Sequence, residues 1–309
     1  MAPDLLLVPK LQPGDLVRLV SPASYPDQSH IDDYIATLES WGLRCDVGES
    51  VLGKHGYMSG TDAERLSDLN TAFRDPEVRA VIATRGGAGA YRISDDIDFE
   101  AVRSDPKLVV GFSDITCLHL SLFTHCQVGG VHGCLNGEIT QSSTKQLLMT
   151  TDPITLISNS AAVSASVNFE GNVTGPIIGG NLQSVSTSVG VRMPPMDGAI
   201  LFLEYHRKGL GTVDRYFTQL IRSGALDGIV GVVLGSFECM RGFSDRGWTI
   251  IDVLNDLLAS LNVPVLGGID SGHNLLDREG NSNFSAIPLG SVATLDTREG
   301  TLTIEPVVK

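Results

Sequence analysis

Apolar runs alternate with amphipathic stretches along the first 140 residues of the chain. Short apolar runs are typical of buried strands, and apolar residues recurring every three or four positions are typical of helices. We therefore expect strands at 16–20, 43–47 and 80–84, helices at 30–41 and 61–73, and a further strand and helix on either side of Ser113. Thr61 and Glu64 have the spacing of a capping box, which indicates where the second helix begins. Strands that alternate with helices predict a parallel, Rossmann-like sheet.

The pattern weakens after residue 140. Between about 140 and 173, Ser, Thr, Asn and Ala predominate around short apolar pieces, and we interpret residues 141–173 as a linker. Beyond it we expect strands near 199–203, 229–234 and 263–267, helices near 213–223 and 249–261, and a closing hairpin around Gly300. The fold class is therefore α/β, with an N-terminal Rossmann-like domain at 1–140 and a C-terminal mixed α/β domain at 174–309. A length of 309 residues agrees with two domains.

The charge of the chain excludes two classes of partner. The formal net charge is −14, and the 22 lysines and arginines form no run. Nucleic acids and anionic membranes both require clustered cations, so we expect neither as a partner. The first residues lack the cationic start and long apolar core of a signal peptide, and no stretch approaches about 18 apolar residues. We therefore expect a cytoplasmic protein.

The five cysteines are Cys45, Cys117, Cys126, Cys134 and Cys239. Their number is odd, they are widely spaced, and no two form a Cys-x-x-Cys pair. This argues against structural disulfides and against a zinc site. No phosphate-binding loop of the Gly-Lys-Ser/Thr type occurs either. We expect neither a metal nor a cofactor.

Ser113 is the first candidate for chemistry. The apolar run Leu108–Gly111 stops at a turn of small residues, and an amphipathic stretch begins directly after Ser113 and continues to about Phe123. A strand that enters a sharp turn displays a hydroxyl clear of the sheet, and the following helix start offers N–H groups to an oxyanion. The alternative is that Ser113 is an ordinary helix N-cap, a common role for serine.

Two later strand ends carry residues that can activate a serine. The run 199–203 leads directly into Glu204, and the run 263–269 leads through Asp270 into His273. Ligand-binding groups of open α/β sheets gather at the carboxyl ends of strands. Ser113, Glu204 and His273 therefore form a candidate catalytic triad.

Around these residues the chain resembles the LD-carboxypeptidase family of serine peptidases, which includes murein tetrapeptide carboxypeptidases and microcin C self-immunity peptidases. The resemblance covers the chain almost end to end. It rests on Gly14-Asp15, Ser21–Ser24, Arg85–Gly87, Gly111–Thr116, Val131–Gly133, Gly179–Leu182, Leu203-Glu204, Val213–Arg215 and Gly272-His273. It implies Ser113 as nucleophile, His273 as general base, Glu204 as the acid that orients His273, and a homodimer.

The chain departs from the family pattern at three positions near these motifs. Ala88 stands where an aromatic residue is common, Cys134 where proline usually follows His-Gly, and Tyr205 where an acidic residue often follows the glutamate. No member of the triad is lost. The departures therefore concern substrate preference more than reaction class, because pocket walls tune selectivity.

The glycine-rich segment 86–89 fits a dinucleotide fingerprint poorly, because Arg92 stands where the third glycine belongs. We interpret Gly86 and Gly87 as glycines that let the backbone approach a substrate, with the N–H groups of Gly87 and Asp114 forming an oxyanion hole. The alternative is a tight turn without a ligand. Arg85 precedes this turn and could bind a substrate carboxylate, although a structural ion pair is the competing interpretation.

These observations predict a serine hydrolase that cleaves a terminal D-amino acid from a small peptide or muropeptide. Two alternatives remain: a microcin-type peptidase acting on aminoacyl-nucleotide conjugates, which requires an aromatic side chain near the cleft, and a non-catalytic protein that binds peptide or sugar. We do not expect the linker to supply such a side chain. His132 is interpreted as a structural histidine with satisfied hydrogen bonds, and Asp270 as the alternative acid to Glu204.

Overall fold

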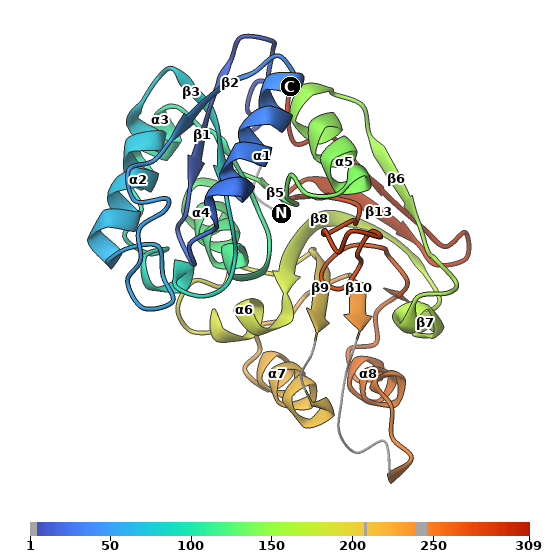
Figure 1. The fold of residues 1–309 in the computed structure, drawn as a ribbon. Coiled ribbons are helices and arrows are strands. Elements are labelled where there is room, and N and C mark those ends of the chain that lie inside the picture. Colours follow the sequence, from blue (N-terminus) through green and yellow to red (C-terminus); the bar gives the residue numbers. More distant parts are fainter. Residues whose placement is uncertain (1–4, 207–208, 239–245) are drawn as a thin grey trace.

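The computed structural model describes residues 5–206, 209–238 and 246–309, and they form an α/β fold built on two sheets (Figure 1). The predicted fold class is confirmed.

The first sheet has six strands in the order β12-β5-β4-β3-β1-β2. All neighbours are parallel except β12, which runs antiparallel to β5 at the sheet edge. The strands are β1 (Leu16–Val20), β2 (Arg44–Val47), β3 (Val78–Ala83), β4 (Leu108–Gly111), β5 (Gly130–His132) and β12 (Ile287–Leu289). The helices are α1 (Gln28–Ser40), α2 (Asp62–Arg74), α3 (Phe99–Ser104), α4 (Thr116–Cys126) and α5 (Glu138–Met149). The capping box predicted at Thr61 is present at the start of α2.

The second sheet has eight strands in the order β6-β14-β13-β8-β9-β10-β11-β7. Its centre, from β8 to β11, is parallel, and its flanks are antiparallel. The strands are β6 (Ile154–Ile157), β7 (Asn168–Phe169), β8 (Asn172–Asn181), β9 (Ile200–His206), β10 (Gly231–Glu238), β11 (Val265–Leu266), β13 (Val292–Asp296) and β14 (Thr301–Ile304). The helices are α6 (Leu182–Thr187), α7 (Leu210–Arg222) and α8 (Ile250–Ala259), and β9 and β10 point toward α7 and α8 (Figure 1).

The segment 141–173, which we interpreted as a linker, contains regular structure. It holds most of α5 together with β6 and β7, both of which pair in the second sheet. Its short apolar pieces are buried: Leu147, Leu148 and Ile154 belong to the main hydrophobic cluster. The segment is therefore not irregular, because a few well-placed apolar residues suffice to dock it. Its role as a linker stays a prediction. The domain boundaries themselves remain a prediction.

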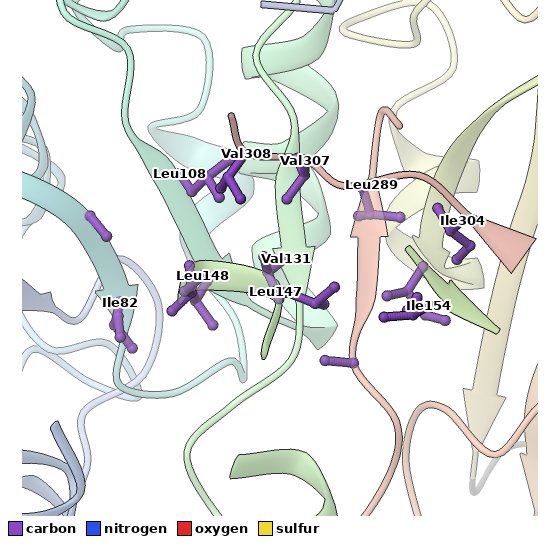
Figure 2. Close-up of a cluster of buried hydrophobic side chains, with 14 of the residues drawn as sticks. Ile82, Leu108, Val131, Leu147, Leu148, Ile154, Leu289, Ile304, Val307 and Val308 are labelled. Atoms are coloured by element: carbon purple, nitrogen blue, oxygen red, sulfur yellow. The ribbon is translucent and has the colours of Figure 1, made fainter. Parts of the chain in front are cut away.

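One hydrophobic cluster joins the two halves of the chain. Leu108 and Val131 of the first sheet lie in the same cluster as Ile154 and Ile304 of the second (Figure 2). Leu289 enters this cluster from β12, a strand of the C-terminal segment that completes the first sheet. Pro288 is tolerated there because β12 is an edge strand. This shared core fixes the ends of both sheets relative to each other.

No helix within the described ranges is long and apolar enough to cross a membrane. Cys45, Cys117, Cys126 and Cys134 are free thiols, and Cys239 lies outside the described residues.

Candidate active site

Ser113 lies on a strained turn directly after β4. Its φ is +65°, in the left-handed region that non-glycine residues rarely adopt, which costs on the order of 1–3 kcal/mol. The turn needs Gly111, because a Cβ there would lie 2.6 Å from Cγ2 of Ile115. A short 3₁₀ turn, Ser113–Ile115, follows and leads into α4, and neither has a side-chain cap. The N-cap interpretation of Ser113 is therefore wrong, and the turn presents its hydroxyl instead.

Glu204 and His273 form a hydrogen-bonded pair. The Nδ1 atom of His273 lies 2.7 Å from Oε2 of Glu204, and the backbone N–H of His273 donates to the same oxygen at 3.2 Å. Gly272 allows this approach, because a Cβ there would lie 2.7 Å from Cβ of Glu204. Asn181, at the end of β8, donates from Nδ2 to Oε1 of Glu204 at 3.0 Å.

The Glu204 carboxylate stays ionised although its side chain is fully buried. Burial alone raises its pKa, but the neighbouring His273, with further contributions from His132 and the Asn181 amide, outweighs burial and lowers the pKa to about 2. A permanent negative charge at Nδ1 holds the imidazole with its other nitrogen, Nε2, available for a proton.

Ser113 and His273 line the same cleft, which has a volume of about 550 Å³. Within the described chain, no hydrogen bond joins Ser113 Oγ to the His273 ring. Catalytic hydrogen bonds are often long before substrate binds and tighten in the substrate complex, so we expect the bond between Ser113 and His273 to form there. Phe112, the residue before Ser113, packs its ring 4.9 Å from that of His273. The structure thus brings the three predicted residues to one site.

The glycine-rich turn lies against the Ser113 turn. A Cβ on Gly86 would lie 2.8 Å from Cβ of Ser113, and Gly87 has a φ of +107°. The Asp114 carboxylate accepts a hydrogen bond from the N–H of Ala90 at 2.7 Å and so ties the two turns together. Burial raises the pKa of Asp114 to about 6, although the backbone N–H groups of Ala90 and Gly89 act to lower it. Gly87 and Asp114 border a second lobe of the cleft beside Ser113. An oxyanion hole at their N–H groups stays a prediction.

We expect Gly86→Ala to lower kcat by about 10²-fold, since the added methyl group must displace the Ser113 turn, and misplacement by about 1 Å can have this effect. Steady-state kinetics with a peptide substrate measure it. Gly190→Ala is the matched control: Gly190 has a φ of +79° and no neighbour within 4 Å, so this variant strains the backbone away from the site. A wild-type kcat for Gly86→Ala would show that the two turns are not mechanically linked.

Arg85 is exposed and lines the 550 Å³ cleft. Among the described residues, its guanidinium forms no ion pair or hydrogen bond. The competing interpretation, a structural ion pair, is therefore not found. Arg85 is placed to meet an anionic group that enters the cleft.

Asp270 does not replace Glu204 in this arrangement. Its carboxylate accepts a hydrogen bond from Nδ2 of Asn159 at 2.8 Å and takes no part in the His273 contact. His132 is fully buried, and burial lowers its pKa to about 4. Both of its ring nitrogens lack a hydrogen-bond partner among the described residues, so the prediction of a satisfied histidine is wrong. Its ring instead packs edge-on against Phe202, at 5.2 Å.

Three residues of the cleft escaped the sequence analysis: Asn181, His206 and His30. Asn181 belongs to the Gly179–Leu182 motif, which we used only for the resemblance. His206 lies two positions beyond Glu204 on β9, and its ring stacks on that of His273. His30 bonds through Nε2 to the carbonyl of Thr84 at 2.8 Å. The signal available for His206 was its position at the end of β9, whereas His30 lies in the first turn of α1 and carried no such signal. Aromatic side chains also reach the cleft, among them Phe112 and Tyr205, and none of the residues that line it comes from the segment 141–173.

No group of three or more His, Cys, Asp or Glu side chains in the described ranges could hold a metal ion.

The sequence matches known protein families along most of its length. Residues 17–133 match the model of the LD-carboxypeptidase N-terminal domain, and residues 174–295 match that of the C-terminal domain. A protein named probable murein peptide carboxypeptidase from Bacillus subtilis is 33% identical over 306 residues, which cover 96% of this chain and 93% of the relative.

Two solved structures share the fold. The muramoyltetrapeptide carboxypeptidase from Oxalobacter formigenes superposes with a TM-score of 0.82 at 26% identity, covering 95% of this chain and 100% of that one. The microcin C7 self-immunity protein MccF superposes with a TM-score of 0.85 at 22% identity, covering 98% of this chain and 100% of that one.

Proposed function

Because the chain belongs to the LD-carboxypeptidase family, we propose that it is a serine carboxypeptidase that releases a terminal D-amino acid from a peptide with an L-to-D linkage. The observation that carries this proposal is the hydrogen bond of 2.7 Å between the buried Glu204 and His273, in the cleft that Ser113 lines from its left-handed turn. If His273 only bound a ligand, it would not need the buried, ionised Glu204 carboxylate as a hydrogen-bond partner at Nδ1.

The proposed reaction begins with attack of Ser113 Oγ on the scissile carbonyl carbon, while Nε2 of His273 accepts the hydroxyl proton. Glu204 stabilises the imidazolium that forms. The backbone N–H groups of Gly87 and Asp114 donate to the oxyanion. His273 then protonates the leaving amine, and the D-amino acid departs from an acyl-enzyme on Ser113. Water, deprotonated by His273, hydrolyses the ester and regenerates the serine.

The substrate we propose is a small peptide or muropeptide of the murein tetrapeptide type. Relatives named murein peptide carboxypeptidase support this class. Arg85 would bind the free carboxylate of the departing residue, so the negative net charge of the protein does not exclude an anionic peptide. A cytoplasmic location and a homodimer complete the proposal.

Incubation with murein tetrapeptide and, separately, with an aminoacyl-sulfamoyl adenosine tests the substrate class. We expect release of the terminal D-alanine from the tetrapeptide, detected by mass spectrometry. Faster hydrolysis of the nucleotide conjugate would favour the microcin-type alternative. Binding of either compound without turnover would favour the non-catalytic one.

We expect Arg85→Ala to weaken binding of peptides with a free C-terminus by about ten- to a hundredfold in Kd, because a charged hydrogen bond contributes about 1.5–3 kcal/mol. C-terminal amides should bind almost unchanged. Titration of both peptide forms against the Ser113→Ala protein measures the difference without turnover. Arg222→Ala, at the exposed end of α7, removes the same charge away from the cleft and serves as control. Equal losses for acids and amides would mean that Arg85 supports the turn instead.

A further inference from the structure

His206 lies face to face with His273. The two ring centroids are 3.9 Å apart, and the ring planes differ by 13°. His206 ends β9, two residues after Glu204, so one strand supplies both the acid that binds the edge of His273 and the ring that covers its face. Nothing in the proposed reaction has yet used this stacked ring.

The hydrogen bond to Glu204 fixes one atom of the His273 ring but not its plane. A ring held only at Nδ1 can swing about its side-chain torsion, and this motion carries Nε2 toward or away from Ser113. A second ring in parallel contact resists the swing, because tilting either ring loses stacking contact. Phe112 packs on the same ring at 4.9 Å with a tilt of 48°, and is therefore a less parallel support.

The place of His206 in the cleft strengthens this argument. His206 borders both lobes, the 550 Å³ cleft that contains Arg85 and the lobe of about 320 Å³ that contains Asp114. Gly87 and Ser113 also border both, so His206 lies where the lobes meet around the nucleophile.

We propose that His206 is a positioning residue, whose ring holds the plane of His273 so that Nε2 faces Ser113. This inference rests on the proposed function. The effect comes from ring contact and not from titration of His206. Any flat ring of similar size at position 206 should therefore hold the His273 ring in the same plane.

The test compares His206→Ala with His206→Phe. We expect His206→Ala to lower kcat by about three- to tenfold with little change in KM, which is the fold-change that loss of one aromatic pair predicts. His206→Phe should keep at least half of the wild-type kcat. The matched control is His125→Ala, because the His125 ring packs at a tilt against that of Phe99, 4.2 Å away, at the other end of α4 from Ser113. It should leave kcat unchanged.

A second measurement is independent of turnover. The Nδ1–H proton of His273, bonded to Glu204, should give a low-field proton resonance that disappears in Glu204→Gln. We expect this resonance to stay sharp in His206→Phe and to broaden in His206→Ala, since the unsupported ring moves.

Three results would overturn the proposal: an unchanged kcat in His206→Ala, equal kcat losses in the Ala and Phe variants, or a change in KM alone. The last would make His206 a substrate contact. If the wild-type protein releases no D-amino acid, the proposed function fails, but the resonance still decides whether His206 holds His273.

Discussion

Replacing Ser113 by alanine is expected to lower kcat by about 10⁶-fold while the protein stays folded. The magnitude follows from the role of a nucleophile in a triad, whose members act as one unit. The reason the fold survives is local. Ser113 is not in the hydrophobic core, and its hydroxyl caps no helix, so only the reacting atom is lost.

Release of D-alanine under single-turnover conditions measures this effect, and circular dichroism with thermal unfolding checks the fold. Alanine disfavours the left-handed φ of +65° as serine does, so the melting temperature should change little. Ser104→Ala, at the exposed end of α3, is the matched control and should keep full activity. More than a tenth of wild-type activity in Ser113→Ala would refute its assignment as nucleophile.

Replacing Glu204 by glutamine is expected to lower kcat by about 10³–10⁴-fold with little change in KM, as acid-to-amide changes in other triads do. Oε1 of Glu204 accepts from Asn181, and Oε2 accepts from both the ring and the backbone of His273. A glutamine cannot satisfy all of these donors, because its amide nitrogen must face one of them. Asn181 cannot simply flip in response, since its Oδ1 caps α6 through the N–H of Ser184. In either orientation the charge that stabilises the imidazolium is gone.

The pH dependence of kcat separates this role from others. With a pKa of about 2, Glu204 remains ionised throughout the working range, so it should contribute no titration step above about pH 3. Asp270→Asn is the near-site control and should stay within a few-fold of wild type, because Asp270 bonds to Asn159 and not to His273. If Glu204→Gln changed KM alone, Glu204 would be a substrate contact, and the triad would need a different acid.

Much of the fold follows from local pattern. The apolar run at Leu108–Gly111 becomes β4, the capping box at Thr61 starts α2, and the hairpin at Gly300 joins β13 to β14. Each of these signals resides in a few consecutive residues. The segment 141–173 gave weak signals, because its regular structure depends on partners more than 100 residues away, such as β14 for β6.

The sequence by itself determined the fold class and the identity of Ser113, Glu204 and His273 as candidates, because strand ends and short motifs are local features that a linear chain displays. Only the tertiary structure decided how these residues meet. It alone placed β12 in the sheet of the other half, buried His132 with no hydrogen-bond partner for either nitrogen among the described residues, and stacked His206 on His273. The physical reason is that each of these features depends on residues from distant strands or loops that pack together. The distances between these residues in the folded protein are set by the packing of a shared core, and no local sequence pattern encodes that packing.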